Sequence, residues 1–247
     1  MTRHRVGVIG LGMALKPHAL SLRDLADRAE VAAAFAPSAA RRDEAARAWS
    51  MPVVDSLDRI FGDRSIDAVL ILTPPWTHTE LVAQAARAGK HVLLEKPVDV
   101  NAARAAAIVE TCERAGVRLA VVFQHRFRPA ALELARILRD GRLGALLSAS
   151  ASIRWWRSPE YFAQPGRGTV ARDGGGVLLT QAIHTLDLLL HLVGPAREVM
   201  AYVDTSPLRR IDTEDVVAGA VRYANGASVD IDATTETKHG KPDRNEN

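Results

Sequence analysis

The chain has 247 residues, of which 47% are hydrophobic and 25% are charged, a composition typical of a globular protein that buries its own core. A single cysteine, Cys112, excludes an internal disulfide framework and a multi-cysteine zinc site, and we expect no metal site. The net charge is only +3 and the basic residues are scattered singly, so we expect no nucleic-acid partner. Because the sequence shows no signal peptide and no run of about 18 continuous apolar residues, we expect a cytoplasmic protein that binds no membrane.

The first half alternates short apolar runs with helical patterns. The apolar runs are at 5–10, 31–36, 68–72, 91–95 and 118–123, with a brief one at 53–54, and the helical patterns are at 15–28, 39–49, 77–88, 101–115 and 129–140. The runs are continuously apolar, which indicates strands that helices cover on both faces. Short links between alternating strands and helices predict an α/β fold with a doubly wound parallel sheet, a Rossmann domain over residues 1–124.

The second half has a different pattern. Residues 145–156 alternate partially, which favours an antiparallel strand with one open face, and a helical pattern follows from Val177 to Gly194. Three strand patterns come next, near 197–204, 215–223 and 227–233, the last two joined by the turn Ala224-Asn225-Gly226. We therefore predict an α+β domain over 125–235 with a largely antiparallel open sheet, and a disordered polar tail over 236–247.

The turn after the first strand has features of a dinucleotide-binding loop. Gly10 permits a tight turn, Gly12 lets the backbone approach a pyrophosphate, and Met13 leads into a helix whose first N–H groups attract anions. Leu15 stands where the fingerprint usually has glycine or alanine. The alternative is a glycine turn in an α/β domain that binds no ligand.

The end of the second strand indicates which cofactor is preferred. An NAD site usually has an acid here, but this chain has Ala36-Pro37-Ser38, with Arg41 and Arg42 just beyond. The Ser38 hydroxyl and the two guanidinium groups suit a 2′-phosphate, so NADP(H) is preferred and NAD(H) is the alternative. A different interpretation is that both arginines are solvated charges on a helix.

Two further loops follow strands of the same parallel sheet. We interpret Thr73, Pro74 and His78, after the strand at 68–72, as cofactor contacts, with a surface histidine as the alternative. Lys96 follows the strand at 91–95 and so lies at the same sheet edge, directly after Glu95. A partly desolvated lysine has a lowered pKa and can exchange a proton with a substrate hydroxyl while hydride is transferred to nicotinamide. Position alone would favour a surface lysine.

The segment GKHVLLEKP (89–97) resembles the second signature of the Gfo/Idh/MocA oxidoreductases, and TPPWTH (73–78), QHRFRPA (124–130) and DGGGVLLTQAIHTLDLL (173–189) extend that resemblance from Arg5 to about Ala233. The resemblance implies a Rossmann domain followed by an α/β domain with a large open sheet. It implies oxidation or reduction of sugars, polyols or nucleotide sugars with NAD(H) or NADP(H). It also implies a catalytic role for Lys96, a cofactor-binding role for Glu95 and Lys96, and a peptide bond before Pro97 that is often cis.

The family's second-domain motif has an acid, then a histidine four residues later, then another acid. It maps onto Thr180, His184 and Asp187, with threonine in place of the first acid. On a regular helix these positions share one face, so the resemblance implies His184 as general acid or base and Thr180 and Asp187 as substrate contacts. For His184 alone, a satisfied core histidine is the alternative.

Aromatic and basic residues before this motif suggest further substrate contacts. One of Trp155 and Trp156 is expected to face a sugar ring, since neighbouring strand residues point to opposite sides. Arg157 and Arg167 are candidates for holding an acidic or phosphorylated substrate. Core packing and solvated charge are the alternatives.

Similar proteins continue their sheet beyond the last hairpin, so we expect a C-terminally truncated chain with a marginal second domain, whose sheet offers a homo-oligomer surface. The predicted function is an NAD(P)-dependent oxidoreductase that transfers a hydride between nicotinamide and a sugar, polyol or nucleotide-sugar substrate. The alternative is an inactive NADP(H)-binding regulatory relative of the same fold.

Overall fold

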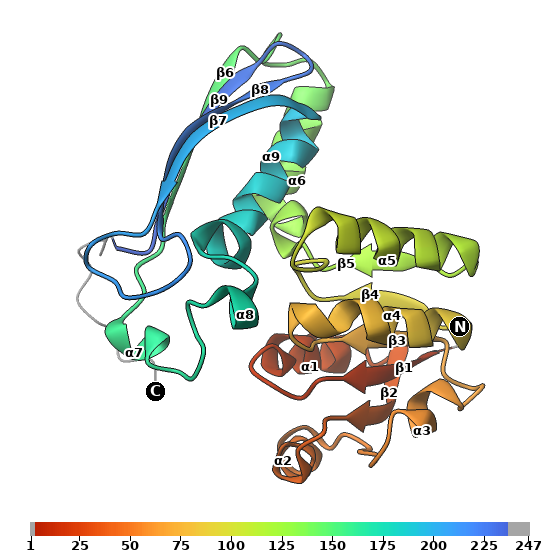
Figure 1. Ribbon diagram of the computed structural model, residues 1–247. Coiled ribbons are helices and arrows are strands. Elements are labelled where there is room, and N and C mark those ends of the chain that lie inside the picture. The colour runs from red at the N-terminus through yellow and green to blue at the C-terminus, as the bar shows by residue number, and fades with distance from the viewer. Residues whose placement is uncertain (1–2, 237–247) are drawn as a thin grey trace. The chain divides into compact units, whose positions relative to one another are not determined.

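The computed structural model describes residues 3–236. The chain divides into two compact units between Val122 and Phe123, close to the predicted boundary after residue 124 (Figure 1). Apart from Glu236, the tail predicted to be disordered lies outside the described residues. Each unit is taken by itself below.

Unit 1 is a parallel α/β sheet with the strand order β2-β1-β3-β4-β5. That order, with every pairing parallel, confirms the predicted doubly wound fold. Its elements are β1 (His4–Ile9), α1 (Leu15–Asp24), β2 (Ala29–Phe35), α2 (Ala39–Trp49), α3 (Asp58–Phe61), β3 (Ala68–Ile71), η1 (Pro75–Thr77), α4 (His78–Arg87), β4 (His91–Leu94), α5 (Ala102–Arg114) and β5 (Leu119–Val121).

The central strands of unit 1 end at one level. Ile9 of β1 is in register with Phe35 of β2 and Ile71 of β3, and Ile71 is in register with Leu94 of β4. The loops that follow these four strands therefore leave the sheet side by side, at its carboxyl edge. This register brings segments far apart in the sequence to one place.

Two core clusters lie on opposite faces of this sheet. Val8 and Leu70 pack with α1 and α2, while Val69 and Ile71 pack with α3, α4 and α5. The prediction that helices cover both faces is wrong at β4, where Leu93 is 39% exposed. The reason is that α1 and α2 extend only over the side of the sheet formed by β1, β2 and β3.

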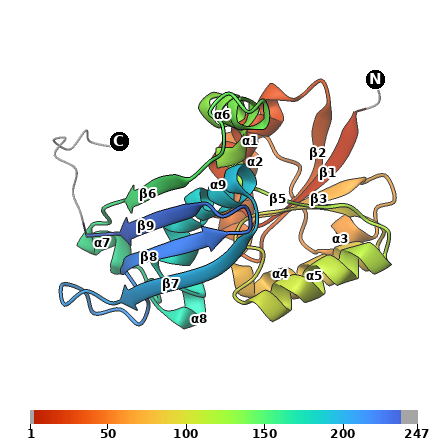
Figure 2. The same ribbon diagram turned by 90° about the horizontal axis from the view of Figure 1, so that it is seen from above.

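Unit 2 has a four-stranded sheet with the order β6-β9-β8-β7 (Figure 2). Its elements are η2 (Gln124–Phe127), α6 (Pro129–Arg139), β6 (Ser148–Arg154), α7 (Pro159–Phe162), α8 (Val170–Asp173), the π-helical turn η3 (Leu178–Ala182), α9 (Ile183–Val193), β7 (Ala196–Asp204), β8 (Val216–Tyr223) and β9 (Ser228–Thr234). The β8–β9 hairpin turns at Gly226, where φ is +90°.

The expectation of an antiparallel strand over 145–156 is wrong. β6 pairs parallel to β9, whereas β9–β8 and β8–β7 are antiparallel, so the sheet is mixed. The alternation in this segment reports correctly which side chains are buried: Ala151 and Ile153 face the core, while Ser150 and Ser152 face outward. It carries no information about the direction of the partner strand.

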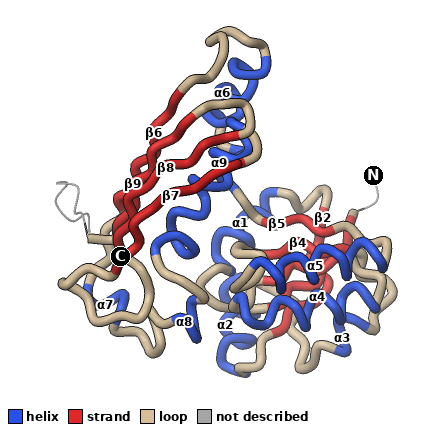
Figure 3. The backbone as a smooth tube through the Cα atoms, turned by 45° about the horizontal axis from the view of Figure 1, so that its top comes forward, coloured by secondary structure: helices blue, strands red, loops and turns tan. Residues whose placement is uncertain are grey.

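The helix α9 packs on one face of this sheet (Figure 3). Among the described residues, the stretch Val170–Val193 is the one long and apolar enough to cross a membrane, and an 18-residue window within it has a mean hydropathy of 1.4. Its apolar side chains, such as Val177 and Ala182, belong to the unit 2 core. Its buried polar residues Gln181, His184 and Asp187 are described below. Packing against the sheet buries part of this stretch, 39% of its most apolar window.

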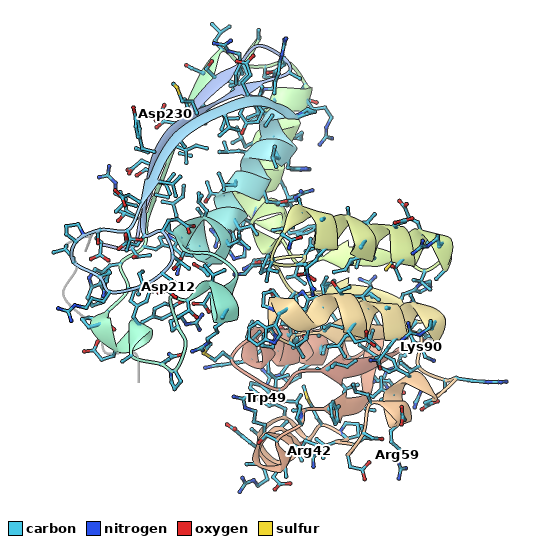
Figure 4. The ribbon with its side chains drawn as sticks, in the orientation of Figure 1. Arg42, Trp49, Arg59, Lys90, Asp212 and Asp230 are labelled. Atoms are coloured by element: carbon cyan, nitrogen blue, oxygen red, sulfur yellow. The ribbon has the colours of Figure 1, made fainter. Side chains whose placement is uncertain are left out.

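Lys90, labelled in Figure 4 beyond the end of α4, is a structural lysine of unit 1. It is 4% exposed, and its Nζ donates hydrogen bonds to the carbonyl oxygens of Asp63 (2.6 Å) and Ile66 (2.9 Å). It thereby ties the loop before β3 to the start of β4.

We expect Lys90→Met to lower the free energy of unfolding by about 2 kcal/mol, because two buried carbonyl groups lose a charged donor. Urea unfolding followed by circular dichroism measures this loss. Lys16→Met, at an exposed position on α1, is the matched control and should change stability by less than about 0.5 kcal/mol. Equal stability of the two variants would contradict the structural role of Lys90.

Candidate active site

The glycine turn after β1 is shaped by close backbone packing. Gly10 has φ +101°, and a Cβ there would lie 2.8 Å from the carbonyl carbon of Leu72 and 2.9 Å from the nitrogen of Thr73. Only glycine fits this approach. The Arg41 Nη1 atom lies 3.4 Å from the position that a Cβ would take at Gly12, and Met13 is 74% exposed. The Arg41 guanidinium therefore lies next to the backbone of the glycine turn.

The helix α1 begins at Leu15 with no side-chain cap, because Ala14 precedes it, and it has no acidic residue in its first turn. By contrast, the side chains of Ser38 and Asn101 cap α2 and α5. The N–H donors and the positive dipole end of α1 therefore suit an anion such as a pyrophosphate. Leu15 is buried in the core, so the departure from the usual fingerprint is absorbed by packing.

The residues after β2 have separate tasks. Ser38 Oγ accepts a long hydrogen bond from the Arg41 amide (3.4 Å). Arg42 Nη1 donates to the carbonyl oxygens of Ala36 (2.7 Å) and Pro37 (3.0 Å), and its side chain therefore holds this loop on α2 (Figure 4). Of the two arginines predicted to bind a 2′-phosphate, Arg41 is thus the one beside the glycine turn.

The loop after β3 is closed by its own hydrogen bonds. The hydroxyl of Thr73 lies 2.6 Å from that of Thr77, which donates to the carbonyl oxygen of Pro74 (2.8 Å). His78 is fully buried, with its Nε2 2.9 Å from the Thr73 carbonyl oxygen and its Nδ1 2.9 Å from that of Val98. His78 therefore connects this loop to the loop after β4. It was predicted to contact the cofactor, but its ring is not exposed.

Lys96 follows β4, and its backbone is held by Glu95. Glu95 Oε2 accepts the Lys96 amide (2.8 Å), and Oε1 lies 2.9 Å from Nε2 of His18 on α1. Burial by itself raises the pKa of Glu95, but the hydrogen bonds and positive charges of His18 and Lys96 outweigh it and hold the pKa below its ordinary value of 4.5. The Lys96–Pro97 bond is cis. An ionised Glu95 therefore connects the cofactor helix to the candidate catalytic lysine.

A second acid stabilises the same loop from the other side. The buried Asp99 accepts hydrogen bonds from Thr79 on α4 (2.6 Å), from the Val100 amide (2.7 Å) and from Arg104 on α5 (2.6 Å). Glu95, His78 and Asp99 together fix the backbone around Lys96 to three helices. Such bracing is what a positioned reacting group needs.

In unit 2, a π-helical turn changes the predicted alignment of the second motif. A π-turn inserts an extra residue, so Thr180, His184 and Asp187 do not follow one regular face. Gln181 is buried in this turn, and His184 and Asp187 are buried further along the helix. Thr180 Oγ1 donates to the carbonyl oxygen of Gly176 (2.6 Å) and also contacts Gln181. Its hydroxyl is thus used within the turn, in the place of the predicted substrate contact.

Glu214 holds the start of this turn. Its carboxylate accepts the amides of Gly176 (2.8 Å) and Leu178 (3.0 Å), and its carbonyl accepts that of Val177 (2.8 Å). A Cβ at Gly176 would lie 1.8 Å from the Glu214 carbonyl oxygen, so the glycine is a steric requirement. The glycine-rich segment therefore serves the packing of the helix that carries His184.

The short helix η2 contacts α9 through two consecutive side chains. Arg126 pairs with both carboxylate oxygens of Asp187, with Nε 2.6 Å from Oδ2. The His125 ring lies against that of His184, with centroids 4.8 Å apart and planes at 31°. Asp187 is therefore tied to Arg126, whereas sequence reasoning assigned it to the substrate.

The remaining predicted substrate residues lie beyond β6, which ends at Arg154. Trp155 and Trp156 are 38% and 36% exposed, so neither is a core residue. The Arg157 guanidinium lies over the rings of Trp155 (5.9 Å) and Tyr161 (5.2 Å). These side chains form an aromatic and cationic surface.

Arg167 is largely buried and pairs with Asp173 at 2.8 Å, and Asp173 also accepts the Gly168 amide. Its charge is thus compensated inside the unit, which weakens the prediction that it binds an acidic substrate. Across residues 3–236, no group of three or more histidine, cysteine or acidic side chains could hold a metal ion.

The sequence by itself did not indicate that His18, Glu214 and His125 contact the candidate site residues or the segments that carry them. His18 and Glu214 act on residues far away in the chain, and no local pattern marks such a partner. His125 had a signal, because it lies in the QHRFRPA segment that contributes to the family resemblance.

Because folding lowers the pKa of Glu95, its ionised form contributes stability that is present above about pH 4.5 and is lost as the pH falls through the folded-state pKa. We therefore expect Glu95→Gln to be less stable than the wild type at pH 7, with a difference that shrinks toward pH 4. Urea unfolding across this pH range measures it, and Glu110→Gln, exposed on α5, is the control. A difference that grows on acidification would contradict the assignment.

Comparisons with known proteins identify relatives of both units. A family model described as "Oxidoreductase family, NAD-binding Rossmann fold" matches residues 4–123, and one described as "GFO/IDH/MocA C-terminal domain" matches residues 131–246. The crystal structure of the WlbA dehydrogenase from Bordetella pertussis in complex with NADH and UDP-GlcNAcA is 34% identical, with a TM-score of 0.88, over 96% of this chain and 72% of that one.

Two relatives of known name are similar in sequence. Inositol 2-dehydrogenase of Rhizobium meliloti is 31% identical over 77% of this chain and 55% of its own length. D-xylose 1-dehydrogenase (NADP(+)) 2 of Haloferax volcanii is 28% identical over 84% of this chain and 62% of its own length. The chain thus spans little more than half of these relatives. With both units matched, it belongs to the Gfo/Idh/MocA family of oxidoreductases.

Proposed function

We propose that this protein transfers a hydride between nicotinamide and the carbinol or carbonyl carbon of a sugar, polyol or nucleotide sugar. The observation that carries the proposal is the level ending of β1, β3 and β4. Because these strands end in register, the glycine turn at Gly12 and Lys96, whose amide Glu95 holds, lie at one edge of the sheet. The names of the relatives support the substrate class, since they include an inositol and a xylose dehydrogenase.

The residues of unit 1 fit a dinucleotide. Gly12, Met13 and the uncapped first turn of α1 would hold the pyrophosphate. The bound nicotinamide supplies the chemistry of hydride transfer. Glu95 orients the Lys96 backbone, and the Lys96 ammonium group holds or moves a proton at the substrate oxygen. In unit 2, His184 is the second group proposed to exchange that proton.

An inactive cofactor-binding relative is the alternative. It is favoured by the internal use of two motif side chains, because Thr180 bonds to Gly176 and Asp187 pairs with Arg126. The intact Lys96 and His184 favour an enzyme. A cytoplasmic location and a homo-oligomer through the sheet of unit 2 also stay predictions.

Lys96→Met tests the proposal. We expect kcat to fall at least about 100-fold because proton transfer loses its positioned group, while the wild-type fold still binds the cofactor through the glycine turn. Nicotinamide absorbance against a panel of sugars, polyols and nucleotide sugars measures turnover, and quenching of intrinsic fluorescence measures binding. Arg114→Met, at an exposed position on α5, is the control. Tight cofactor binding by the wild type without turnover on any substrate would favour the inactive relative.

We also propose a preference for NADP(H) over NAD(H). It is supported by Arg41 beside the glycine turn, by Ser38, and by the lack of an acid in Ala36-Pro37-Ser38. Arg42 is committed to its own loop and contributes less.

Arg41→Ala should therefore weaken NADPH binding by at least about tenfold, because a charged hydrogen bond to the 2′-phosphate is lost, and leave NADH binding nearly unchanged. Calorimetric titration with both cofactors measures this, with Arg47→Ala, exposed on the same helix, as the matched control. An equal loss for both cofactors would assign Arg41 to the pyrophosphate instead.

A further inference from the structure

The short helix η2 contacts α9 through two pairs of side chains. The two residues on η2 are consecutive, and the two on α9 are three positions apart. His125 lies against His184, with ring centroids 4.8 Å apart, and Arg126 pairs with Asp187 through both carboxylate oxygens. Residues at i and i+3 are neighbours on a helix surface, so the two contacts form one patch. We call His125 and Arg126 the QHRF clamp.

The two imidazole rings and Asp187 are shielded from water, whereas the Arg126 side chain is 37% exposed. His125 and His184 are 6% and 5% exposed, and Asp187 is also buried. The indole of Trp155 meets the His125 ring edge-on, with centroids 6.3 Å apart. The His125 ring is therefore held by packing against rings, which restricts its orientation and that of His184.

The charges around His125 come from η2, the start of α6 and α9. Burial and the positive charge of Arg128 lower the pKa of His125, while Asp187 raises it by a smaller amount. Two cationic imidazoles 4.8 Å apart would also repel each other strongly away from water. Both effects favour the neutral form of the His125 ring.

Asp187 bears on the charge of His184. An acid three residues along the helix would stabilise an imidazolium and make His184 a poor base at neutral pH. The Arg126 guanidinium cancels that negative charge by pairing with both oxygens. The pair thereby reduces the stabilisation that Asp187 would give to a protonated His184.

We propose that His125 and Arg126 are positioning residues that hold the His184 ring in place and keep it neutral, so that it can accept the proton of a substrate hydroxyl. This inference rests on the proposed function. In the oxidation direction the carbinol O–H bond would break and its proton would pass to His184, while a bound NAD(P)+ would supply the acceptor for the hydride of the C–H bond. The carbinol becomes a carbonyl, and atoms and charge balance.

The charge effect is tested by NMR titration of the full chain carrying 15N-labelled histidine, without substrate. Freeing the carboxylate with Arg126→Gln should raise the titration midpoint of His184 by about one pH unit. Arg126→Gln/Asp187→Asn should return it to the wild-type value. Arg136→Gln, an exposed cation on α6, is the matched control and should leave the midpoint unchanged.

The positioning effect is tested by two substitutions of the ring. His125→Ala should lower kcat about tenfold with little change in KM, because His184 loses the surface that orients it. His125→Phe keeps a flat ring and should retain kcat within about threefold. The acid limb of the kcat/KM profile should move to higher pH in Arg126→Gln, a change that a purely structural defect would not produce.

A His184 midpoint that does not move in Arg126→Gln, or is not restored in the double variant, would overturn the inference. So would full activity of His125→Ala with an unchanged pH profile. If the NMR shifts follow the expectation but no substrate reduces nicotinamide, the dehydrogenase assignment fails and the charge coupling of the clamp stands. The two failures are thus distinguishable.

Discussion

The in-register ending of β1, β2, β3 and β4 is the constraint on which the candidate site of unit 1 depends. Parallel strands present their carboxyl ends at one edge, so loops from four parts of the chain begin side by side. The register brings together the glycine turn after β1, Arg41 at the start of α2, the loop after β3 and Lys96 after β4. These features are far apart in the sequence. Each of these loops alone would be an ordinary surface feature.

What distinguishes this edge is how firmly its loops are held. His78 uses both ring nitrogens to join the loops after β3 and β4, and Glu95 connects His18 on α1 to the Lys96 amide. These buried polar groups cost desolvation and are compensated by hydrogen bonds. The result is a lysine whose backbone is fixed while its side chain remains partly exposed.

In unit 2, a different set of contacts fixes the position of His184. The π-turn and its Glu214 cap set where His184 lies on the core helix, and η2 contacts that helix through the QHRF clamp. Two charged residues, Arg126 and Asp187, pair with each other near His184, the histidine that we propose to exchange a proton with the substrate. Buried ion pairs contribute little net stability. The effect of this pair on the charge of its neighbour His184 is therefore of greater interest than its contribution to stability.

The sequence by itself determined the alternation of strands and helices, the glycine turn, the Ala224-Asn225-Gly226 hairpin and the family signature around Lys96, because each depends on a local period or on a short motif. Only the tertiary structure decided that β6 is parallel to β9. It also decided that His78 and Asp187 bond to other parts of their own units. The contacts by which His18, Glu214 and His125 support the segments that carry Lys96 and His184, the proposed reacting groups, likewise come from the tertiary structure. The physical reason is that a side chain's partner across the fold is set by packing and register, and a periodic pattern records which face is buried without recording what lies against it.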